Sequence, residues 1–354
     1  MKEILQDLTY DELCALMSSL GAEKFRASQV AQGLAKGKKI TDINIPKALK
    51  EKLLERCEDE PVKIQETYTG SDGTEKYLFR LADGNIIEGV LMKYKYGNTQ
   101  CVSTQVGCRM GCRFCASTLH GLTRNLTAGE ILSQVLAVNA LHTDGKARGV
   151  TNIVLMGSGE PLDNYDSTIR FIRNVSSATS LNISPRNISL STCGLVPQMY
   201  RLADEGLPVN LTVSLHATTD AERARTMPIA SKYTIRQILD ACSNYFSKTG
   251  RRYIFEYSLI DGENAEPEDA KALIQLLKGR PCHVNLIRLN EVKERTLRSA
   301  TERKAQAFLK TLTEGGISAT IRRQIGADIG GACGQLRASY LHTRDTNGNE
   351  SPDE

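Results

Sequence analysis

Short apolar runs alternate with helical patterns over residues 99–320, and this alternation limits the fold more than any other feature. Amphipathic stretches such as 128–141 and 234–246 separate the runs. Repeated strand–helix units predict a parallel sheet, either open or curved into a barrel, and in both forms the active site lies at the carboxyl ends of the strands. The expected strands are 101–106, 152–156, 187–190, 209–213, 253–259 and 283–287.

The first part of the chain follows a different pattern. Thr9 and Glu12 form a capping-box pattern that predicts a helix start, and further helices are expected at 25–34 and from Pro46 onward. After Pro61 apolar and polar residues alternate, and Asp-Gly pairs between the runs predict hairpins.

These changes of pattern divide the chain into four expected segments. They are a small helical accessory domain (1–60), a β-hairpin extension of the core (61–98), an α/β core (99–342) and a polar tail (343–354). The helices of the first segment are equally compatible with a simple packing cap on the core. The tail is polar enough to be disordered.

Polar residues follow several expected strands at the point where each strand ends. Each of these residues alone is weak evidence for a functional site, because a Gly-rich turn is usually only a turn and a lone His more often has a structural role. Their shared position predicts one site. They are Met156-Gly-Ser-Gly-Glu160-Pro161, Ser191, Ser214-Leu-His216 and Asn290.

Three cysteines, Cys108, Cys112 and Cys115, lie within eight residues of one another. A cubane iron–sulfur cluster is held by one thiolate per iron, so three cysteines leave one iron open to another ligand. The alternatives are a zinc site completed by Cys101 or His120, or thiols that are close only in sequence. Zinc ligands more often come as separated pairs, and the spacing therefore favours a cluster.

Composition indicates the compartment. The chain has ten cysteines in 354 residues, no secretory signal pattern after Met1 and no apolar run long enough to span a membrane. We therefore expect a cytoplasmic protein without a membrane partner, in which thiols stay reduced.

A net charge of +4 permits a nucleic-acid partner without arguing for one. Five thiols are interpreted as buried or incidental: Cys14, Cys57, Cys193, Cys242 and Cys282.

The cysteine spacing, with Phe114 before the last thiol, resembles the signature of radical S-adenosylmethionine (SAM) enzymes. Further motifs along nearly the whole chain resemble the RlmN/Cfr family of radical SAM RNA methyltransferases. The motifs are Cys101-Val-Ser-Thr-Gln-Val-Gly-Cys108, Met156-Gly-Ser-Gly-Glu-Pro161, Ser191-Thr-Cys-Gly194, Val213-Ser-Leu-His-Ala217, Val284-Asn-Leu-Ile287 and Gly331-Ala-Cys-Gly-Gln-Leu336.

This resemblance implies a partial (β/α) barrel of the radical SAM type, with a [4Fe–4S] cluster and SAM as cofactors. The RlmN branch methylates carbon 2 of an adenosine in 23S rRNA and, in some members, of an adenosine in tRNA. The Cfr branch methylates carbon 8. The Asn290-to-Arg295 stretch and the accessory domain favour the RlmN branch. Implied partners are 23S rRNA, tRNA and an external one-electron donor of flavodoxin or ferredoxin type, and we expect a monomer.

Carried over by motif, the cluster ligands fall on Cys108, Cys112 and Cys115. Leu215, one of the implied SAM contacts, is expected to contribute only main chain and packing. Hydroxyls and an amide can hold ribose, and Glu160 can accept from the methionyl ammonium. The implied SAM contacts are Gly159, Glu160, Ser191, Ser214, Leu215, His216 and Asn290.

The resemblance also implies three catalytic residues. Carbon 2 of adenine is electrophilic and does not attack a sulfonium methyl, so Cys333 first carries the methyl group as S-methylcysteine. The methylene radical made from it adds to the ring, Glu88 accepts a proton, and Cys101 attacks Cys333 to leave a transient disulfide. Without the resemblance, Glu88 would be interpreted as an outward-facing, solvated strand residue. We expect the Cα atoms of Cys101 and Cys333 to approach to roughly 4.4–6.8 Å.

Two positions depart from the family pattern beside the cofactor. Ser158 stands where Met is usual, and Glu291 follows Asn290 where Pro is usual. Five arginines are candidates for phosphate contacts or for solvated surface charges: Arg124, Arg251, Arg252, Arg322 and Arg323.

Three other functions remain open from the sequence. The chain could be a Cfr-type carbon-8 methyltransferase, a noncatalytic iron–sulfur or zinc RNA-binding module, or a radical enzyme acting on a peptide or small metabolite.

Overall fold

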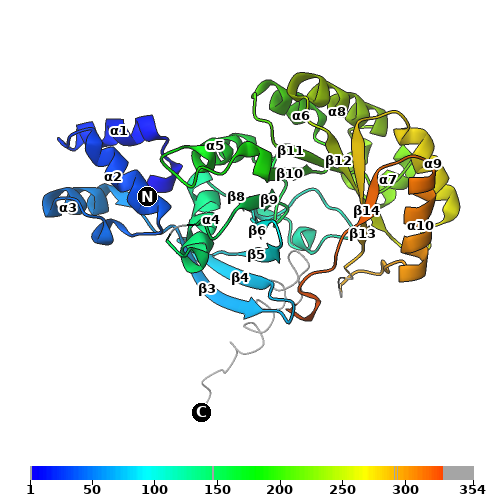
Figure 1. Ribbon diagram of the computed structural model, residues 1–354, viewed down its shortest axis with the longest axis horizontal. Coiled ribbons are helices and arrows are strands. Elements are labelled where there is room, and N and C mark those ends of the chain that lie inside the picture. The colour runs from blue at the N-terminus through cyan, green and yellow to red at the C-terminus, as the bar shows by residue number, and fades with distance from the viewer. Residues whose placement is uncertain (1, 146, 291, 293, 330–354) are drawn as a thin grey trace, which may run out of the picture.

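A computed structural model describes residues 2–145, 147–290, 292 and 294–329, and its centre is one ten-stranded mixed sheet (Figure 1). From β6 to β14 the neighbouring strands are parallel, whereas β3, β4, β5 and β6 pair antiparallel. In spatial order the strands are β14 (Ala319–Ile321), β13 (Cys282–Arg288), β12 (Tyr253–Leu259), β11 (Asn210–Ser214), β10 (Ile188–Thr192), β9 (Asn152–Leu155), β6 (Gly97–Cys101), β5 (Ile86–Tyr94), β4 (Glu75–Leu81) and β3 (Val62–Thr69).

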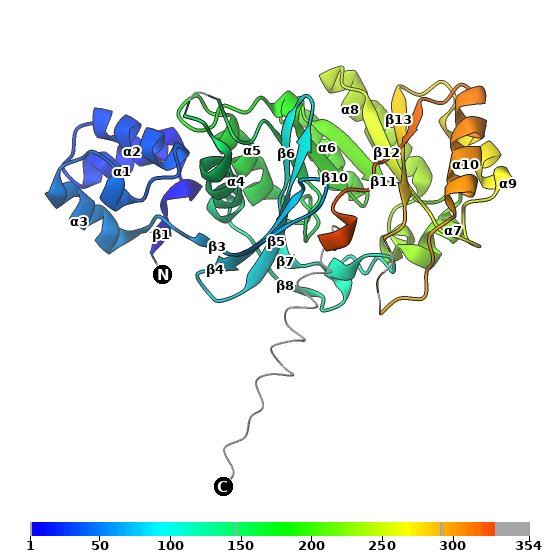
Figure 2. The same ribbon diagram turned by 60° about the horizontal axis from the view of Figure 1, so that its bottom comes forward.

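Helices cover the outer side of this curved sheet (Figures 1 and 2). Capping boxes at Thr127 and Thr234 begin two of the longest ones, because each threonine side chain accepts from a backbone N–H in the first turn. The core helices are α4 (Ala128–His142), α5 (Tyr165–Ser176), α6 (Val196–Asp204), α7 (Asp220–Thr226), α8 (Ile235–Thr249), α9 (Pro267–Leu277) and α10 (Glu302–Glu314). The predicted fold class, a partial barrel of α/β units with a hairpin extension and extra N-terminal helices, is confirmed.

The expected strand 101–106 is wrong. β6 ends at Cys101, and β7 (Gln105–Gly107) pairs instead with β8 (Leu122–Asn125) in a separate two-stranded sheet. The backbone between them bonds to side chains and loops: Ser103 N–H donates to Gln134 Oε1 at 3.0 Å, and Thr104 N–H donates to the Ser158 carbonyl at 2.9 Å. These partners redirect the chain toward the cysteine loop.

Three N-terminal helices pack around a small core of their own, and this unit lies against α4 and α5 (Figure 2). Asp7 accepts from Gly129 N–H at the start of α4, and Glu12 forms a two-pronged ion pair with Arg170 of α5 at 2.8 and 3.0 Å. The unit contains α1 (Tyr10–Ser19), α2 (Phe25–Ala35), α3 (Lys47–Arg56), β1 (Glu3–Ile4) and β2 (Cys57–Glu58).

The two faces of β5 serve different purposes. Ile87 and Leu91 belong to the main hydrophobic core, whereas Val90 and Met92 face a cavity inside the sheet. Because side chains alternate along a strand, Glu88 lies on the cavity face. None of the helices in the described part of the chain is both long enough and apolar enough to cross a lipid bilayer.

Candidate active site

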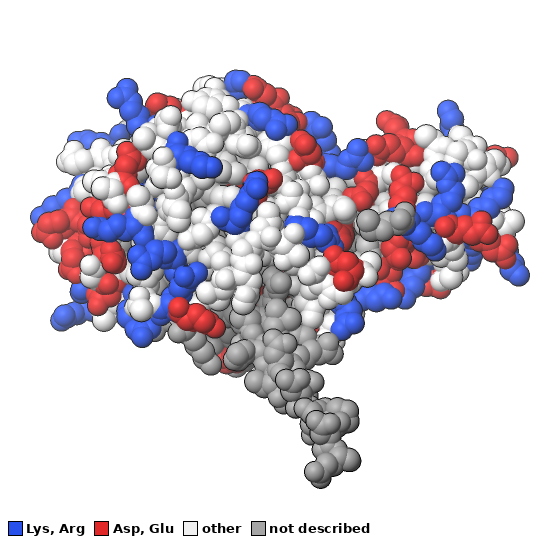
Figure 3. Space-filling view, turned by 180° about the vertical axis from the view of Figure 1, so that it is seen from behind, with Lys and Arg blue, Asp and Glu red and all other residues white. Residues whose placement is uncertain are grey.

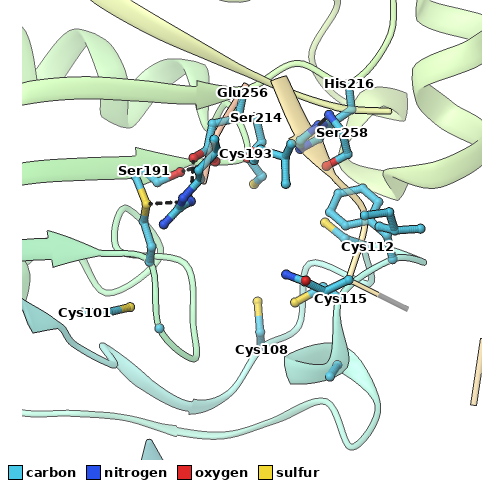
Figure 4. A pocket seen from close by; sticks show the side chains of 18 of the residues that line it. Cys101, Cys108, Cys112, Cys115, Ser191, Cys193, Ser214, His216, Glu256 and Ser258 are labelled. Carbon is cyan, nitrogen blue, oxygen red and sulfur yellow. Dashed lines mark hydrogen bonds and ion pairs between the residues drawn. The ribbon is translucent and has the colours of Figure 1, made fainter. Parts of the chain in front are cut away.

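A cavity of about 300 Å³ opens inside the curved sheet, beside the carboxyl ends of the parallel strands (Figure 4). The strand-end residues singled out in the sequence and the three clustered cysteines line the same cavity. Cys108, Cys112 and Cys115 lie across the open space from Ser191 and Ser214 in Figure 4. The residues of the predicted site that line the cavity are Cys101, Cys108, Cys112, Cys115, Gly159, Glu160, Ser191, Ser214, His216 and Asn290.

Three predicted residues are placed differently. Leu215 is fully buried and is not among the residues that line the cavity. Glu88 lies on the cavity face of β5 without reaching the lining. Cys333 lies outside the described residues, and so does its expected approach to Cys101.

Hydrogen bonds to its backbone hold the cysteine loop in one conformation. Cys108 N–H donates to the Gly121 carbonyl at 2.8 Å, and Thr118 Oγ1 donates to the carbonyls of Cys112 and Cys115 at 3.0 and 2.9 Å. Gly107 adopts a φ of +78°, and a Cβ there would lie 2.0 Å from the Gly121 carbonyl oxygen. Only glycine therefore fits at the loop's entry.

Two of these thiols are deeply buried. Burial raises the pKa of Cys108 to about 12 and raises the pKa of Cys112 further, while Cys115 is half-buried. A buried thiol keeps its proton until a cation replaces it, because metal binding selects the thiolate. The pair is therefore suited to a metal group rather than to free thiolate chemistry.

The donor set fits an iron–sulfur cluster better than a single ion. Among the described residues, no three His, Cys, Asp or Glu side chains converge closely enough to hold one metal ion. A zinc site needs such convergence, with sulfur about 2.3 Å from the metal. A cubane cluster does not, because each thiolate binds a different iron. Three thiols around one cavity, two of them buried, are thus compatible with a [4Fe–4S] cluster.

Glu160 lies at the bottom of the glycine-rich turn. Its Oε2 accepts from Cys193 N–H at 2.7 Å and its Oε1 accepts from Leu162 N–H at 3.1 Å, while burial raises the pKa of the carboxyl. A Cβ on Gly159, whose φ is +107°, would lie 2.6 Å from Gln105 Cβ. Any side chain at this position would therefore clash with Gln105, so the turn requires glycine.

His216 is a neutral imidazole. Burial and, secondarily, the charge of Arg223 lower its pKa to about 3, and its Nδ1 accepts from Ser258 N–H at 2.9 Å. The ring proton therefore resides on Nε2, which makes this nitrogen a donor. Phe114 of the cysteine loop packs edge-on against the ring, with centroids 4.7 Å apart.

Glu256 is a cavity residue that the sequence reasoning missed. It is 7% exposed, accepts from Ser191 Oγ at 3.3 Å and lies 3.5 Å from Arg322 Nη1. The Arg322 contact is an ion pair without hydrogen-bond geometry, and Glu256 Oε1 has no hydrogen-bond donor among the described residues. Burial raises the pKa of this carboxyl. A charged residue inside the apolar run of β12 was the available signal, because such strands are usually buried on both faces.

Glu88 is not the solvated residue that strand pattern alone predicts. It is 4% exposed, and its Oε2 lies 3.6 Å from Nζ of Lys76, which is fully buried on the neighbouring strand β4. In the strand register Lys76 is opposite Val90, so both charged side chains lie on the cavity face. Cys101 is also opposite Val90 and lines the cavity.

The departures at Ser158 and Glu291 have different outcomes. Ser158 is buried outside the cavity lining, with its hydroxyl 3.5 Å from Ser117 Oγ, so its side chain leaves the cavity wall unchanged. Glu291 lies outside the described residues, whereas Asn290 is exposed at the cavity edge.

Most of the candidate phosphate-binding arginines bond within the protein. Arg124 pairs with Asp83 and Glu130, Arg251 donates to Asn210, and Arg252 donates to the Cys282 carbonyl. On the face in Figure 3, Lys and Arg are interspersed with Asp and Glu toward both ends of the molecule, and no large patch of one sign appears.

Comparison with known proteins agrees with this geometry. Residues 102–274 match the model of the radical SAM superfamily. A radical SAM methyltransferase from Sphaerobacter thermophilus has a similar structure, with a TM-score of 0.91 and 41% identity over 94% of this chain and 98% of that chain.

Curated relatives are similar over nearly the full length. A probable dual-specificity RNA methyltransferase RlmN from Clostridium botulinum (strain Alaska E43 / Type E3) is 50% identical, covering 98% of this chain and 100% of the relative. The RlmN of the same description from Clostridium perfringens (strain SM101 / Type A) is 52% identical over 97% of this chain and 99% of the relative.

The α/β fold and the thiol-lined cavity, together with these matches, define a radical SAM enzyme, whose cofactors are a [4Fe–4S] cluster and SAM. Within this class the chain belongs to the RlmN family of methyltransferases.

Proposed function

We propose that this protein methylates carbon 2 of adenosine in 23S rRNA and in tRNA. One observation carries the proposal: a single cavity is lined by the three clustered cysteines, by the strand-end residues expected to contact SAM, and by Cys101. The curated relatives are described as dual-specificity RNA methyltransferases, which supports RNA as the substrate class.

Cys108, Cys112 and Cys115 would hold the cluster. Ser191, Ser214 and the Nε2–H of His216 would contact SAM, and Gly159 would allow the close approach of backbone. Glu160 already accepts two backbone hydrogen bonds, and each carboxylate oxygen has a second lone pair for an ammonium donor. When bound, the cluster and SAM supply a methyl group and, after one-electron reduction, a 5′-deoxyadenosyl radical.

The residues of the chain perform the steps that follow. The Cys333 thiolate carries the methyl group and, after loss of one hydrogen atom, links it to the adenine ring. Glu88 takes the proton from carbon 2 as the radical adduct gives up one electron, which the oxidised cluster would accept. Cys101 attacks the sulfur of Cys333, so the carbon–sulfur bond breaks, a disulfide joins the two cysteines, and the released methylene carbon takes up a proton to become the methyl group.

The burial of Glu88 suits this task. The Glu88 carboxylate is buried, and Lys76 balances its charge. Burial shields the carboxylate from water until the substrate proton is transferred to it. Its position on the cavity face of β5, two residues from Val90, puts it on the side of the sheet where Cys101 lies.

We also infer the oligomeric state, the compartment and the electron donor. The protein is a monomer that works in the cytoplasm and receives electrons one at a time from a flavodoxin or ferredoxin. Reduced cytoplasmic conditions match a chain whose described cysteines are all thiols.

The test is an anaerobic reaction of the reconstituted protein with SAM, a reductant and unmodified 23S rRNA or tRNA, followed by nucleoside mass spectrometry. We expect 2-methyladenosine from both RNAs. Cys108→Ala should abolish it, whereas Cys57→Ala, which removes a buried thiol of β2 in the N-terminal unit, should not.

Other products would contradict the proposal in distinguishable ways. An 8-methyladenosine peak would assign the Cfr-type reaction. Formation of 5′-deoxyadenosine without a modified nucleoside would keep the radical chemistry and exclude these RNAs as substrates. A fully loaded cluster that never cleaves SAM would leave only a noncatalytic RNA-binding role.

A further inference from the structure

A fully buried arginine lies behind the strand-end loops that line the cavity. Arg223, on α7, is 0% exposed. Its guanidinium donates to the carbonyls of Cys193 at 2.6 Å, Ser214 at 3.0 Å and Leu215 at 3.2 Å. These carbonyls belong to the loops that leave β10 and β11, so the charge is directly behind the loops that form the site.

The charge of Arg223 is not compensated by a carboxylate. In the part of the chain that the structure describes, no Asp or Glu oxygen lies within salt-bridge distance of the guanidinium, and its Nη1 is buried without a hydrogen-bond acceptor. Cys193, Cys112 and Asp220 lie close enough for their ionised forms to interact with the guanidinium. Cys112 is one of the three clustered thiols.

The helix that carries Arg223 is tied to the cysteine loop. Arg113 N–H, one residue after Cys112, donates to the Thr226 carbonyl at the end of α7 at 2.8 Å. Met227, the next residue, lines the cavity together with Cys112 and Cys193. The guanidinium is therefore held in a fixed position relative to the loop.

Burial of an unpaired cation is costly, and such groups in proteins are normally paired. The carbonyl hydrogen bonds reduce the cost, but they supply dipoles and no opposite charge. A cubane cluster held by three thiolates is an anion, and reduction adds a further negative charge to it. Net charge and hydrogen bonds near the sulfurs set the reduction potential of such a cluster.

We propose that Arg223 is the counter-cation of the iron–sulfur cluster, and that its buried charge makes the cluster easier to reduce. The inference depends on membership of the radical SAM class and not on the identity of the RNA product. The guanidinium of Arg223 donates to backbone carbonyls of the site loops, so it acts as a positioning and charge-compensating residue.

Arg109 provides a matched control. It is adjacent to Cys108 in sequence, but its side chain is 63% exposed and is paired with Asp163 on two oxygens. Solvent screens an exposed charge, so the loss of Arg109 should leave the cluster potential nearly unchanged.

The test is a redox titration of the reconstituted cluster, followed by electron paramagnetic resonance, in wild type, Arg223→Gln, Arg223→Lys and Arg109→Gln. Iron and sulfide content and circular dichroism are measured in parallel. At a fixed solution potential, Arg223→Gln should lower the ratio of reduced to oxidised cluster at least tenfold, which equals about 59 mV for a one-electron couple. Arg223→Lys and Arg109→Gln should stay within about threefold of wild type, about half that shift.

Each outcome of the titration either supports or overturns the role of the Arg223 charge. If Arg223→Gln holds a full cluster at the wild-type potential, or if Arg223→Lys shifts the ratio as far as Arg223→Gln does, the charge is not what matters and the proposal is overturned. If Arg223→Gln cannot assemble the cluster while Arg223→Lys can, the charge requirement is supported. If neither variant assembles the cluster, the guanidinium is needed for its hydrogen bonds to the backbone carbonyls and not for its charge, and the proposal fails.

Discussion

Single buried side chains define the site at the residue scale. Glu160 and Glu256 both turn carboxylates toward the strand ends, but only Glu160 was found from sequence, because it lies in a motif. Glu256 left a weaker signal, a lone charge in an apolar strand. Arg223 left none, since an arginine on a short helix with three other charged residues resembles a solvent-facing residue. Burial of such groups depends on tertiary packing, which local pattern does not encode.

Replacement of Glu256 should weaken SAM binding. Glu256 lines the cavity, and its Oε2 accepts from Ser191 Oγ while its Oε1 has no hydrogen-bond donor among the described residues, so a ligand hydroxyl or amino group would donate to Oε1. Hydrogen bonds to charged groups contribute about 1.5–3 kcal/mol, so Glu256→Gln should lower SAM affinity about 10- to 100-fold. Calorimetry on the reconstituted protein measures this change. Glu314→Gln, at the exposed end of α10, is the control. Equal affinities in both variants would exclude Glu256 as a ligand contact.

His216 should make the folded protein sensitive to mild acid. Its pKa is about 3 in the folded state against an ordinary value of 6.5, so below about pH 6.5 the unfolded chain binds a proton that the folded chain does not. Stability therefore falls as the pH falls, by up to about 1.4 kcal/mol per pH unit from this residue.

His216→Asn removes the titration while keeping an acceptor for Ser258 N–H, and asparagine tolerates the φ of +58° at this position. From pH 7.5 to pH 5.5 the melting temperature of wild type should fall further than that of the variant. Parallel curves would show that His216 gains a proton in the folded protein as readily as in the unfolded chain.

At the scale of elements, periodicity predicted most strands and helices near their observed places. The expected helix 128–141 corresponds to α4 (Ala128–His142), and the expected strand 253–259 is β12. The strand after Cys101 failed because Gln134 and Ser158, both distant in sequence, supply the hydrogen bonds that a neighbouring strand would otherwise supply. The register between β4 and β5 also places Lys76 and Glu88 on the same buried face, which periodicity alone does not predict.

The Lys76–Glu88 pair gives a prediction for strands β4 and β5. Breaking a buried ion pair leaves an uncompensated charge and typically costs about 3–5 kcal/mol. Lys76→Met should therefore destabilise the protein strongly, and Lys76→Met combined with Glu88→Gln should recover most of the loss. Thermal unfolding of the single and double variants checks this coupling. If the two losses simply add, the charges do not depend on each other.

At the scale of the whole molecule, one curved sheet brings together residues separated by some two hundred positions in the chain. Cys101, the cysteine loop, the glycine-rich turn and Asn290 line one cavity because parallel strands all deliver their carboxyl ends to the same side. That convergence was predictable from strand–helix alternation. The docking of the N-terminal helices on α4 and α5 was not, since it relies on specific pairs such as Glu12 with Arg170.

The most direct test of the whole account is the fate of Cys101→Ala. This variant retains the cluster thiols and Cys333 but lacks the thiol that would release the product. Incubated anaerobically with SAM, reductant and RNA, it should accumulate a covalent protein–RNA adduct, seen as a nuclease-sensitive band of lower gel mobility. The adduct should be missing in Cys101→Ala/Cys333→Ala and in Cys101→Ala/Cys108→Ala. If Cys101→Ala instead releases 2-methyladenosine at the wild-type rate without an adduct, the proposed thiol mechanism in this cavity is wrong.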